Sequence, residues 1–236
     1  MKKISVICPI RNERDNLAEL TARTRSALEE YFINNEAELI LVDDGSSDDS
    51  LDLMRRLSKE FGGLRIIALN THLGQAAALS SGLNASSGEI IILMNADLQV
   101  FPEDIPVLIK KIKEGYDLVN AIRTKRKDML LFRISTWVLG CLIKLFFDIS
   151  VKDPSSNFIA TRNRFIANVK LKCNDHRYIV PILYNRGARK IAQVGVRHKL
   201  REKGKSKYKL SKLFFAVPDF IGFCIREFNN KPRIQK

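Results

Sequence analysis

The sequence predicts an α/β fold in one domain, with a mostly parallel sheet covered by helices on both faces. Short apolar runs alternate with amphipathic stretches through the first half of the chain, and turn or cap residues separate them. Repeated strand and helix units of this kind build parallel sheets. With 236 residues, of which 45% are hydrophobic, the chain is long enough to bury a core.

Five strands and four helices are expected in alternation. The strands are the apolar runs at residues 4–8, 38–42, 64–69, 89–94 and 117–122. The helices that follow the first four strands are expected at residues 16–32, from Leu51 to Phe61, at 74–85 and at 103–114. The first carries leucines along one face, the second lies between an acidic cap and Gly62, the third is made of small residues, and the fourth starts after Pro102.

The cysteines and the lengths of the apolar runs exclude several classes of protein. The four cysteines form no C-x-x-C pair, so neither a disulfide framework nor a zinc site is expected, which suits a reducing cytosol. The first apolar run meets the charged residues 11–15 too soon for a signal peptide. Because no run reaches the roughly 18 apolar residues of a spanning helix, the protein is not expected to cross a membrane by itself.

The net charge of +14 is concentrated towards the C-terminus. Residues 1–115 carry 13 Lys and Arg against 18 Asp and Glu (net −5), residues 116–185 carry 12 against 5 (net +7), and residues 186–236 carry 15 against 3 (net +12). This asymmetry predicts a surface that meets an anion, such as anionic lipid or a phosphorylated substrate, although a solvated basic tail gives the same pattern. No nucleic acid partner is expected, because the chain lacks a recognition-helix, RRM or zinc signature.

A polar cluster, NADLQ at residues 95–99, follows the apolar run at residues 89–94. Ligands of open α/β sheets bind at the carboxyl ends of the strands. The carboxylate of Asp97 and the amide oxygen of Gln99 are hard ligands that suit Mg²⁺ or Mn²⁺ holding a diphosphate. The alternative is that Asp97 only caps the turn before Pro102.

Two more polar loops are expected at the same edge of the sheet. Residues 9–13 follow the first strand and residues 43–46 follow the second. A carboxylate at Asp43 or Asp44 suits hydrogen bonds from a base or a ribose. Neither G-x-G-x-x-G nor a P-loop motif occurs, so a nucleotide is expected to be held in a different way.

These polar blocks resemble the family 2 glycosyltransferases of the GT-A fold, and among them the dolichyl- and polyprenyl-phosphate sugar synthases. The resemblance is carried by VICPIRNE at 6–13, LVDDGSSD at 41–48, NTHLG at 70–74, NADLQVFP at 95–102 and REKGKSKY at 201–208. It implies a GT-A catalytic domain at residues 1–198, divided into a nucleotide-sugar half (1–123) and an acceptor half (124–198). A basic lid loop and an amphipathic membrane-surface helix are expected to follow at 199–236.

The resemblance also implies roles for single residues. The nucleotide-diphospho-sugar donor would contact Pro9, Arg11, Glu13, Asp43 or Asp44, Asn95 and Ala96. A Mg²⁺ or Mn²⁺ ion would bind Asp97 and Gln99, although Asn95 departs from the Asp-x-Asp pattern that is usual in the family. The acceptor phosphate would meet Arg123, Arg133, Ser135 and Lys205, and Arg201 would act from the lid.

Two apolar segments of the second half suit a membrane surface. Residues 135–147 and 212–225 are too short to span a bilayer, and the second follows a basic loop. For residues 135–147 an ordinary core helix is an equal alternative. The expected location is the inner face of the cytoplasmic membrane, with peripheral attachment to the lipid surface or to a membrane-protein partner.

The predicted function is inverting transfer of a sugar to a polyprenyl (dolichyl-type) phosphate. The alternative acceptor is a hydroxyl of a cell-surface polysaccharide or lipopolysaccharide, with Asp153 as general base. A phosphate monoester is already anionic and needs no base, in which case Asp153 would position the donor or the lid. The expected catalytic residues are therefore Asp97, Asp153 and Arg201.

Overall fold

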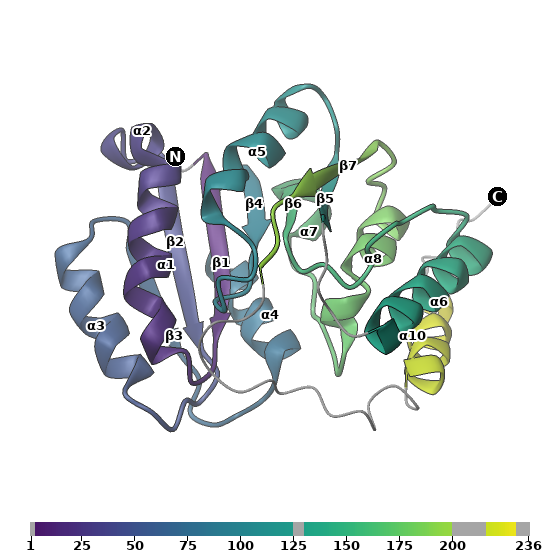
Figure 1. Ribbon diagram of the computed structural model, residues 1–236, viewed down its shortest axis with the longest axis horizontal. Helices are drawn as coiled ribbons and strands as arrows, with labels where there is room; N and C mark the ends of the chain where they lie inside the picture. Colours follow the sequence, from purple (N-terminus) through teal and green to yellow (C-terminus); the bar gives the residue numbers. More distant parts are fainter. Residues whose placement is uncertain (1–2, 125–129, 200–215, 230–236) are drawn as a thin grey trace.

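A seven-stranded sheet forms the centre of the computed structural model, which describes residues 3–124, 130–199 and 216–229 (Figure 1). The strand order is β3-β2-β1-β4-β6-β5-β7. Strand β6 runs antiparallel to both of its neighbours, β4 and β5, and the other neighbouring pairs are parallel. The prediction of a mostly parallel sheet is confirmed.

The chain order of the elements is as follows. The strands are β1 (Ile4–Ile10), β2 (Ala37–Asp43), β3 (Leu64–Ala68), β4 (Ile90–Leu93), β5 (Leu118–Arg123), β6 (Ile159–Arg162) and β7 (Ile191–Val196). The helices are α1 (Arg14–Ala27), α2 (Glu29–Ile33), α3 (Ser50–Glu60), α4 (Gln75–Ala85), α5 (Ile105–Lys113), α6 (Leu130–Phe147), α7 (Asn163–Ile166), α8 (Ile179–Asn185) and α10 (Ala216–Asn229). Two 3-10 turns are η1 (Pro102–Asp104) and η2 (Asp175–Arg177).

Two of the predicted helices differ from the structure at one end. The helix expected at residues 16–32 is divided into α1 and α2, because Leu28 leaves helical geometry (φ −125°, ψ 26°) while its side chain stays buried. The helix expected at 103–114 opens as the 3-10 turn η1, in which the N–H of Ile105 bonds to the carbonyl oxygen of Pro102. Pro106 has no N–H with which to make the α-helical bond to that oxygen. Strands β6 and β7 were not predicted from the sequence.

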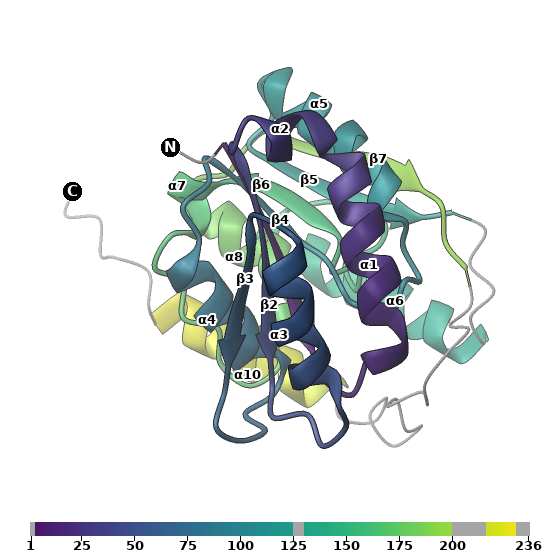
Figure 2. The same cartoon turned by 90° about the vertical axis from the view of Figure 1, so that its left-hand side faces the viewer.

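Helices cover both faces of the sheet because the side chains of each strand alternate between them. Val6 of β1 belongs to a core shared with Leu17 of α1 and Leu108 of α5. Its neighbour Ile7 belongs to the opposite core, which includes Leu79 of α4 and residues of α6, α8 and α10. Figure 2 shows α1 and α4 on opposite sides of the sheet.

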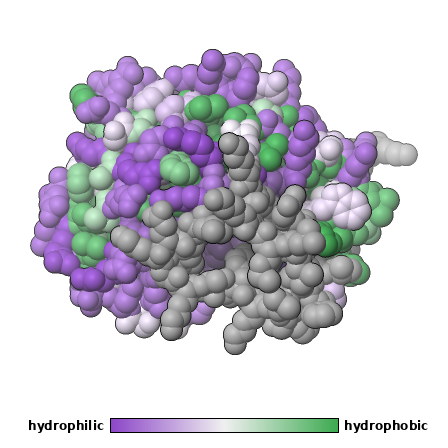
Figure 3. All heavy atoms as spheres, in the orientation of Figure 1, coloured by the Kyte–Doolittle hydropathy of each residue, from purple (hydrophilic) through white to green (hydrophobic). Residues whose placement is uncertain are grey.

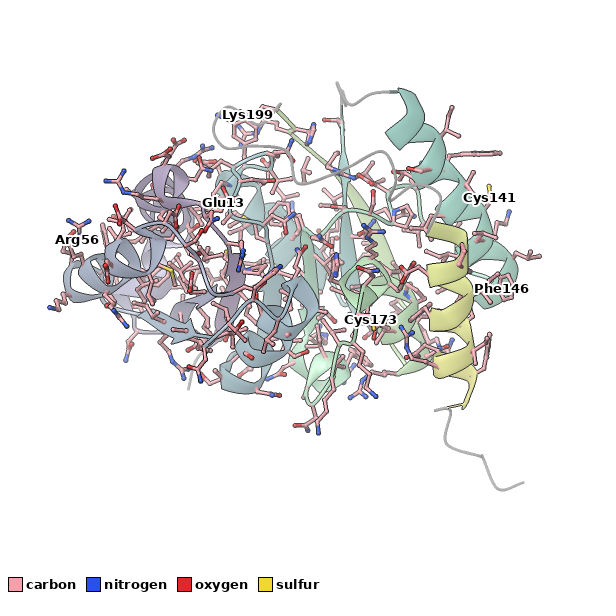
Figure 4. The ribbon with its side chains drawn as sticks, turned by 90° about the horizontal axis from the view of Figure 1, so that it is seen from below. Glu13, Arg56, Cys141, Phe146, Cys173 and Lys199 are labelled. Carbon is pink, nitrogen blue, oxygen red and sulfur yellow. The ribbon has the colours of Figure 1, made fainter. Side chains whose placement is uncertain are left out.

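Helices α6 and α10 lie side by side at one end of the molecule (Figures 1 and 4). Phe220 and Phe223 of α10 are buried, and the ring of Phe223 stacks on Tyr178 with 4.4 Å between centroids. Phe147 of α6 packs against both phenylalanines. One face of each predicted membrane-surface segment is therefore part of the core. The division of the chain at residues 198 and 199 stays a prediction.

Candidate active site

The carboxyl ends of β1, β2, β4, β5 and β7 meet at one edge of the sheet, together with the amino end of β6. Figure 4 looks onto this edge, where Glu13 and Lys199 come from loops that are far apart in the sequence. The three polar loops predicted to converge follow β1, β2 and β4 and do so here. In open α/β sheets this edge binds ligands.

The loop after β1 is fastened to the loop after β2. Nη1 of Arg11 donates hydrogen bonds to the carbonyl oxygens of Asp44 and Gly45, at 2.7 Å each. The side-chain oxygen of Asn12, a residue with positive φ (52°), accepts a hydrogen bond from the backbone N–H of Ser47 (2.8 Å). These bonds fix the spacing between the two loops, so the Arg11 guanidinium has a structural role at this edge.

Glu13 is buried at the start of α1. Its carboxylate accepts a hydrogen bond from Nδ2 of Asn16 (2.7 Å), and its backbone N–H donates to Oγ of Ser50 (3.1 Å). Pro9, near the end of β1 and four residues before Glu13, is half-buried. Glu13 thus holds the start of α1 against the start of α3.

The two aspartates after β2 are also buried, and each is held by backbone N–H groups. Asp43 accepts the N–H of Ser46 (3.1 Å). Asp44 accepts the N–H groups of Leu73 (2.8 Å) and Gly74 (3.0 Å) and contacts Nδ1 of His72 (2.8 Å). The loop before α4 is thereby bound to the end of β2.

Gly45 permits this approach of the two loops. Its φ is +64°, and a Cβ atom there would lie 2.7 Å from the backbone carbon of Thr71. Only glycine accepts both constraints. The contact of His72 with Asp44 was not predicted from the sequence, although His72 lies in the block NTHLG that carries part of the resemblance.

The residues after β4 alternate between the core and the edge. Ala96 and Leu98 are buried, whereas Asn95, Asp97 and Gln99 are half-buried and lie on the edge. Leu98 has a positive φ (54°), which is unusual for a bulky residue and costs on the order of 1–3 kcal/mol. Strain of this size is characteristic of positions that hold neighbouring side chains for function.

The backbone at residues 197–199 is fixed alongside this motif. The N–H of Lys199 donates to the carbonyl oxygen of Gln99 (3.0 Å), and Val100 forms a bridge with His198. Arg197 pairs with Asp104 (2.9 Å). The basic segment that follows residue 199 therefore begins at the motif. Arg201 and Lys205 lie outside the described residues.

Asp97 and Gln99 offer one carboxylate and one amide oxygen to a metal ion. No cluster of three or more His, Cys, Asp or Glu side chains suited to a metal occurs within the described ranges. Mg²⁺ and similar ions nevertheless bind through one or two carboxylates when substrate phosphates and water complete the shell. The donor set fits an ion that arrives with a diphosphate. Oδ1 of Asp97 accepts the N–H of Gln99 at 3.3 Å, which keeps the two residues together.

Arg123 and Asp153 form an ion pair on the other side of the edge. Nε and Nη2 of Arg123 each donate to one carboxylate oxygen of Asp153 at 2.8 Å, and the backbone N–H of Arg123 adds a third bond (3.2 Å). The side chains are 17% and 3% exposed. Nη2 of Arg123 also donates to Oγ of Ser155, which contacts Thr136 of α6. The predicted acceptor arginine and the predicted base thus bind each other.

The remaining predicted acceptor residues lie on α6. Ser135 is half-buried one position before Thr136. Arg133 lies in the first turns of α6, and its side chain is outside the described part of the structure.

The sequence matches one protein family and several relatives of known name. The model of a family described as Glycosyl transferase family 2 matches residues 5–166. The chain is 37% identical over 222 residues to the undecaprenyl-phosphate 4-deoxy-4-formamido-L-arabinose transferases of Serratia proteamaculans and Salmonella choleraesuis. The match covers 94% of this chain and 67% of each relative.

Solved structures show the same fold. Glucosyl-3-phosphoglycerate synthase of Mycobacterium tuberculosis, solved with Mn²⁺, uridine diphosphate and phosphoglyceric acid, matches 99% of this chain and 80% of its own, with a TM-score of 0.70 and 22% identity. Mannosyl-3-phosphoglycerate synthase of Rubrobacter xylanophilus matches 100% and 77%, with a TM-score of 0.71 and 14% identity. At these identities the likeness concerns the fold alone.

Proposed function

Because the chain belongs to glycosyl transferase family 2, we propose that it is an inverting enzyme that moves a sugar from a nucleotide-diphospho-sugar to a polyprenyl phosphate. The observation that carries the proposal is the polar edge where the loops after β1, β2 and β4 meet. Relatives at 37% identity are named as undecaprenyl-phosphate sugar transferases, which supports the lipid-phosphate acceptor. Membership of the family makes the chain a glycosyltransferase.

The donor is assigned to the loops after β1, β2 and β4. Asp43, Asp44 and Arg11 shape the nucleotide pocket, because their side chains fix the loops that border it. A Mg²⁺ or Mn²⁺ ion held by Asp97 and Gln99 would neutralise the charge that develops on the departing diphosphate. The solved neighbours with Mn²⁺ and uridine diphosphate support a divalent ion. Arg201, in the segment that follows Lys199, would add positive charge from the lid.

The ion pair of Arg123 and Asp153 favours a phosphate over a hydroxyl as the acceptor. A general base needs a free lone pair directed at the proton that it removes. The carboxylate of Asp153 instead accepts three hydrogen bonds from Arg123 and one from Ser155 (3.2 Å). A phosphate monoester needs no base, so Asp153 acts by positioning Arg123 towards the acceptor.

The exposed faces of α6 and α10 support a location at the membrane surface. Trp137 is 68% exposed and Leu145 76% on α6, and Ile225 is 56% exposed on α10. Figure 3 shows apolar residues gathered at the end of the molecule where these helices lie. No helix among the described residues is both long enough and apolar enough to cross a membrane. Attachment from the cytoplasmic side, through the paired apolar faces, would bring the edge of the sheet to a lipid phosphate.

The test is transfer from radiolabelled nucleotide sugars to undecaprenyl phosphate in phospholipid vesicles. We expect label in the lipid fraction in the presence of Mn²⁺ or Mg²⁺, and its loss on chelation. Dephosphorylated undecaprenol in the same vesicles is the matched control and should accept no sugar. Label that appears only in water-soluble product would contradict the lipid acceptor. Transfer that is indifferent to chelation would contradict the metal role of Asp97 and Gln99.

A further inference from the structure

A second asparagine, Asn157, lies two residues before β6, a strand that pairs with β4. The strand runs antiparallel to β4, with Leu93 opposite Ile159. The two strands end at this pair, and continuing their register by two residues would set Asn157 opposite Asn95. Leu93 and Ile159 both belong to the core that includes Leu79 of α4. If the alternation of side chains continues past the strand ends, Asn95 and Asn157 share that face, from which Gln75 of α4 contacts Asn95.

Gln75 completes this group from the first turn of α4. Its Nε2 donates a hydrogen bond to Oδ1 of Asn95 (2.9 Å). That bond fixes the orientation of the Asn95 amide, so Nδ2 of Asn95 and Oε1 of Gln75 are turned towards other partners. The pair presents one donor group and one acceptor group at the edge of the sheet.

The oxygen of Asn157 lacks the partner that a buried polar atom requires. Oδ1 of Asn157 is buried and accepts no hydrogen bond from any residue in the described ranges. Oδ1 of Asn120 is also buried and accepts no hydrogen bond from the described residues. Asn120 lies on β5, the strand on the other side of β6, and its Nδ2 donates to the carbonyl oxygen of Asp153 (3.1 Å). Unsatisfied buried groups are rare in native proteins and call for an explanation, of which an absent ligand is one.

We propose that Asn157, together with Asn95 and Gln75, selects the transferred sugar. This amide group, Gln75, Asn95 and Asn157, would bind hydroxyl or acylamido substituents of the sugar ring, which both donate and accept hydrogen bonds. All three side chains are uncharged and supply no cation to balance a carboxylate, so the group suits a neutral sugar better than a uronate. Asn157 is the specificity-determining residue, and Gln75 positions Asn95.

The proposal rests on the proposed function and differs from it in a measurable way. The nucleotide and the metal are assigned to Asp43, Asp44, Asp97 and Gln99, whereas the amide group is assigned to the sugar alone. A change at Asn157 should therefore alter the binding of the sugar and leave the binding of the free nucleoside diphosphate unchanged.

The experiment compares wild type with Asn157→Ala on a panel of sugars that share one nucleotide. We expect kcat/KM for the preferred neutral sugar to fall about tenfold, the effect of one lost hydrogen bond, and discrimination among the sugars to narrow. Calorimetric titration with the nucleoside diphosphate and Mn²⁺ should give the wild-type affinity. The thermal midpoint should stay the same or rise, because the buried oxygen that is removed had no partner.

A second variant and a control separate this role from a structural one. Gln75→Leu frees the Asn95 amide and should also narrow the discrimination. Asn163→Ala removes an asparagine that follows β6 at its other end, where Nδ2 donates to the carbonyl oxygen of Gly88 (2.9 Å), and should lower the thermal midpoint without changing the sugar preference.

Two results would overturn the inference while the proposed function stands. One is wild-type sugar preference in Asn157→Ala. The other is an equal loss of affinity for the nucleoside diphosphate and the nucleotide sugar. If the wild-type protein transfers none of the sugars to lipid phosphate, the proposed function fails, and binding of the nucleotide sugars to wild type and Asn157→Ala still decides the inference.

Discussion

The two sides of the polar edge hold their carboxylates by different means. On the side proposed to bind the donor, here called the donor side, Asp43 and Asp44 are held largely by backbone N–H groups, which carry no net charge. On the acceptor side, Asp153 is neutralised by the guanidinium of Arg123. Backbone donors stabilise a carboxylate and leave its charge in place to act at the site, whereas an ion pair removes that charge from the local field. The donor side therefore suits a cation, and the acceptor side depends on the pair for its stability.

The largest effect is expected when a charge is removed from the donor side. Asp97→Asn keeps the size and an acceptor oxygen but removes the carboxylate. We expect kcat/KM to fall at least about 100-fold, because an electrostatic contact to a developing charge is lost. The Mn²⁺ concentration needed for half-maximal rate should also rise. Initial rates over a range of Mn²⁺ concentrations measure both effects. Asp52→Asn on the exposed face of α3 is the matched control and should retain activity. Wild-type rates in Asp97→Asn would remove Asp97 from the metal site.

On the acceptor side, the same kind of change should act on stability first. Arg123→Met leaves Asp153 as a buried carboxylate without its cation, which costs about 3–5 kcal/mol of unfolding free energy. Unfolding in urea measures the change. The double variant Arg123→Met/Asp153→Leu should recover most of it, because the unpaired charge is gone.

Arg55→Met supplies the control for this prediction. Arg55 pairs with Asp52 at 3.2 Å, and both side chains are more than 60% exposed. An exposed pair contributes between 0 and about 1 kcal/mol, so the stability of Arg55→Met should be close to that of wild type. Equal losses in Arg55→Met and Arg123→Met would show that the buried pair has no special role.

The secondary structure of the first half, up to Arg123, could be predicted from the sequence to a greater extent than that of the second half. Up to Arg123, the five strands and the main helices α1, α3, α4 and α5 follow from the spacing of apolar residues and from caps such as the one before α3, whereas the break at Leu28 and the turn η1 do not. Strand β6 has only four residues. Its place between β4 and β5 depends on pairing between distant residues, 72 positions apart for Ile90 and Arg162 and 43 positions apart for Leu118 and Thr161. No local pattern encodes such pairing.

The site shows the same division between local and distant interactions. The motif at residues 95–99 and the aspartates after β2 could be placed at the edge, because loops after parallel strands meet there. The contact of His72 with Asp44 and the ion pair of Arg123 with Asp153 join residues 28 and 30 positions apart. These contacts depend on how the loops close in three dimensions. The roles assigned to Asp153 and Arg123 from the sequence took each residue alone and did not foresee their pairing.

The exposed apolar faces of α6 and α10 are expected to bind a membrane surface. Trp137→Ser should weaken binding to anionic vesicles about tenfold, a loss of about 1.4 kcal/mol of binding free energy. This loss is smaller than the free energy gained when a large apolar side chain is fully buried. Co-sedimentation with vesicles measures the change. Ile33→Ser on α2, where Ile33 is 72% exposed, is the matched control and should bind as wild type does. Equal losses in the two variants would contradict a membrane role specific to α6 and α10.

The smallest expected effect concerns a carboxylate at the other end of β2 from Asp43. Burial alone would raise the pKa of Glu38, but hydrogen bonds from Ser5 (2.6 Å), Arg65 (2.8 Å) and Ser87 (2.8 Å) outweigh it and lower that pKa below its ordinary value of 4.5. A lowered pKa in the folded state means that the ionised form contributes stability above about pH 4.5, and that this contribution is lost as the pH falls through the folded pKa.

Glu38→Gln keeps the shape of the side chain and removes this titration. The variant should be less stable than wild type at pH 7, because Arg65 loses its partner, and the difference should shrink as the pH is lowered towards 3. Thermal unfolding from pH 7 to pH 3 measures the trend for both proteins. A constant difference across that range would mean that the pKa of Glu38 is the same in the folded and unfolded chain. In that case the hydrogen bonds would only offset the cost of burial, and the donor half would hold this carboxylate without stabilising its charge.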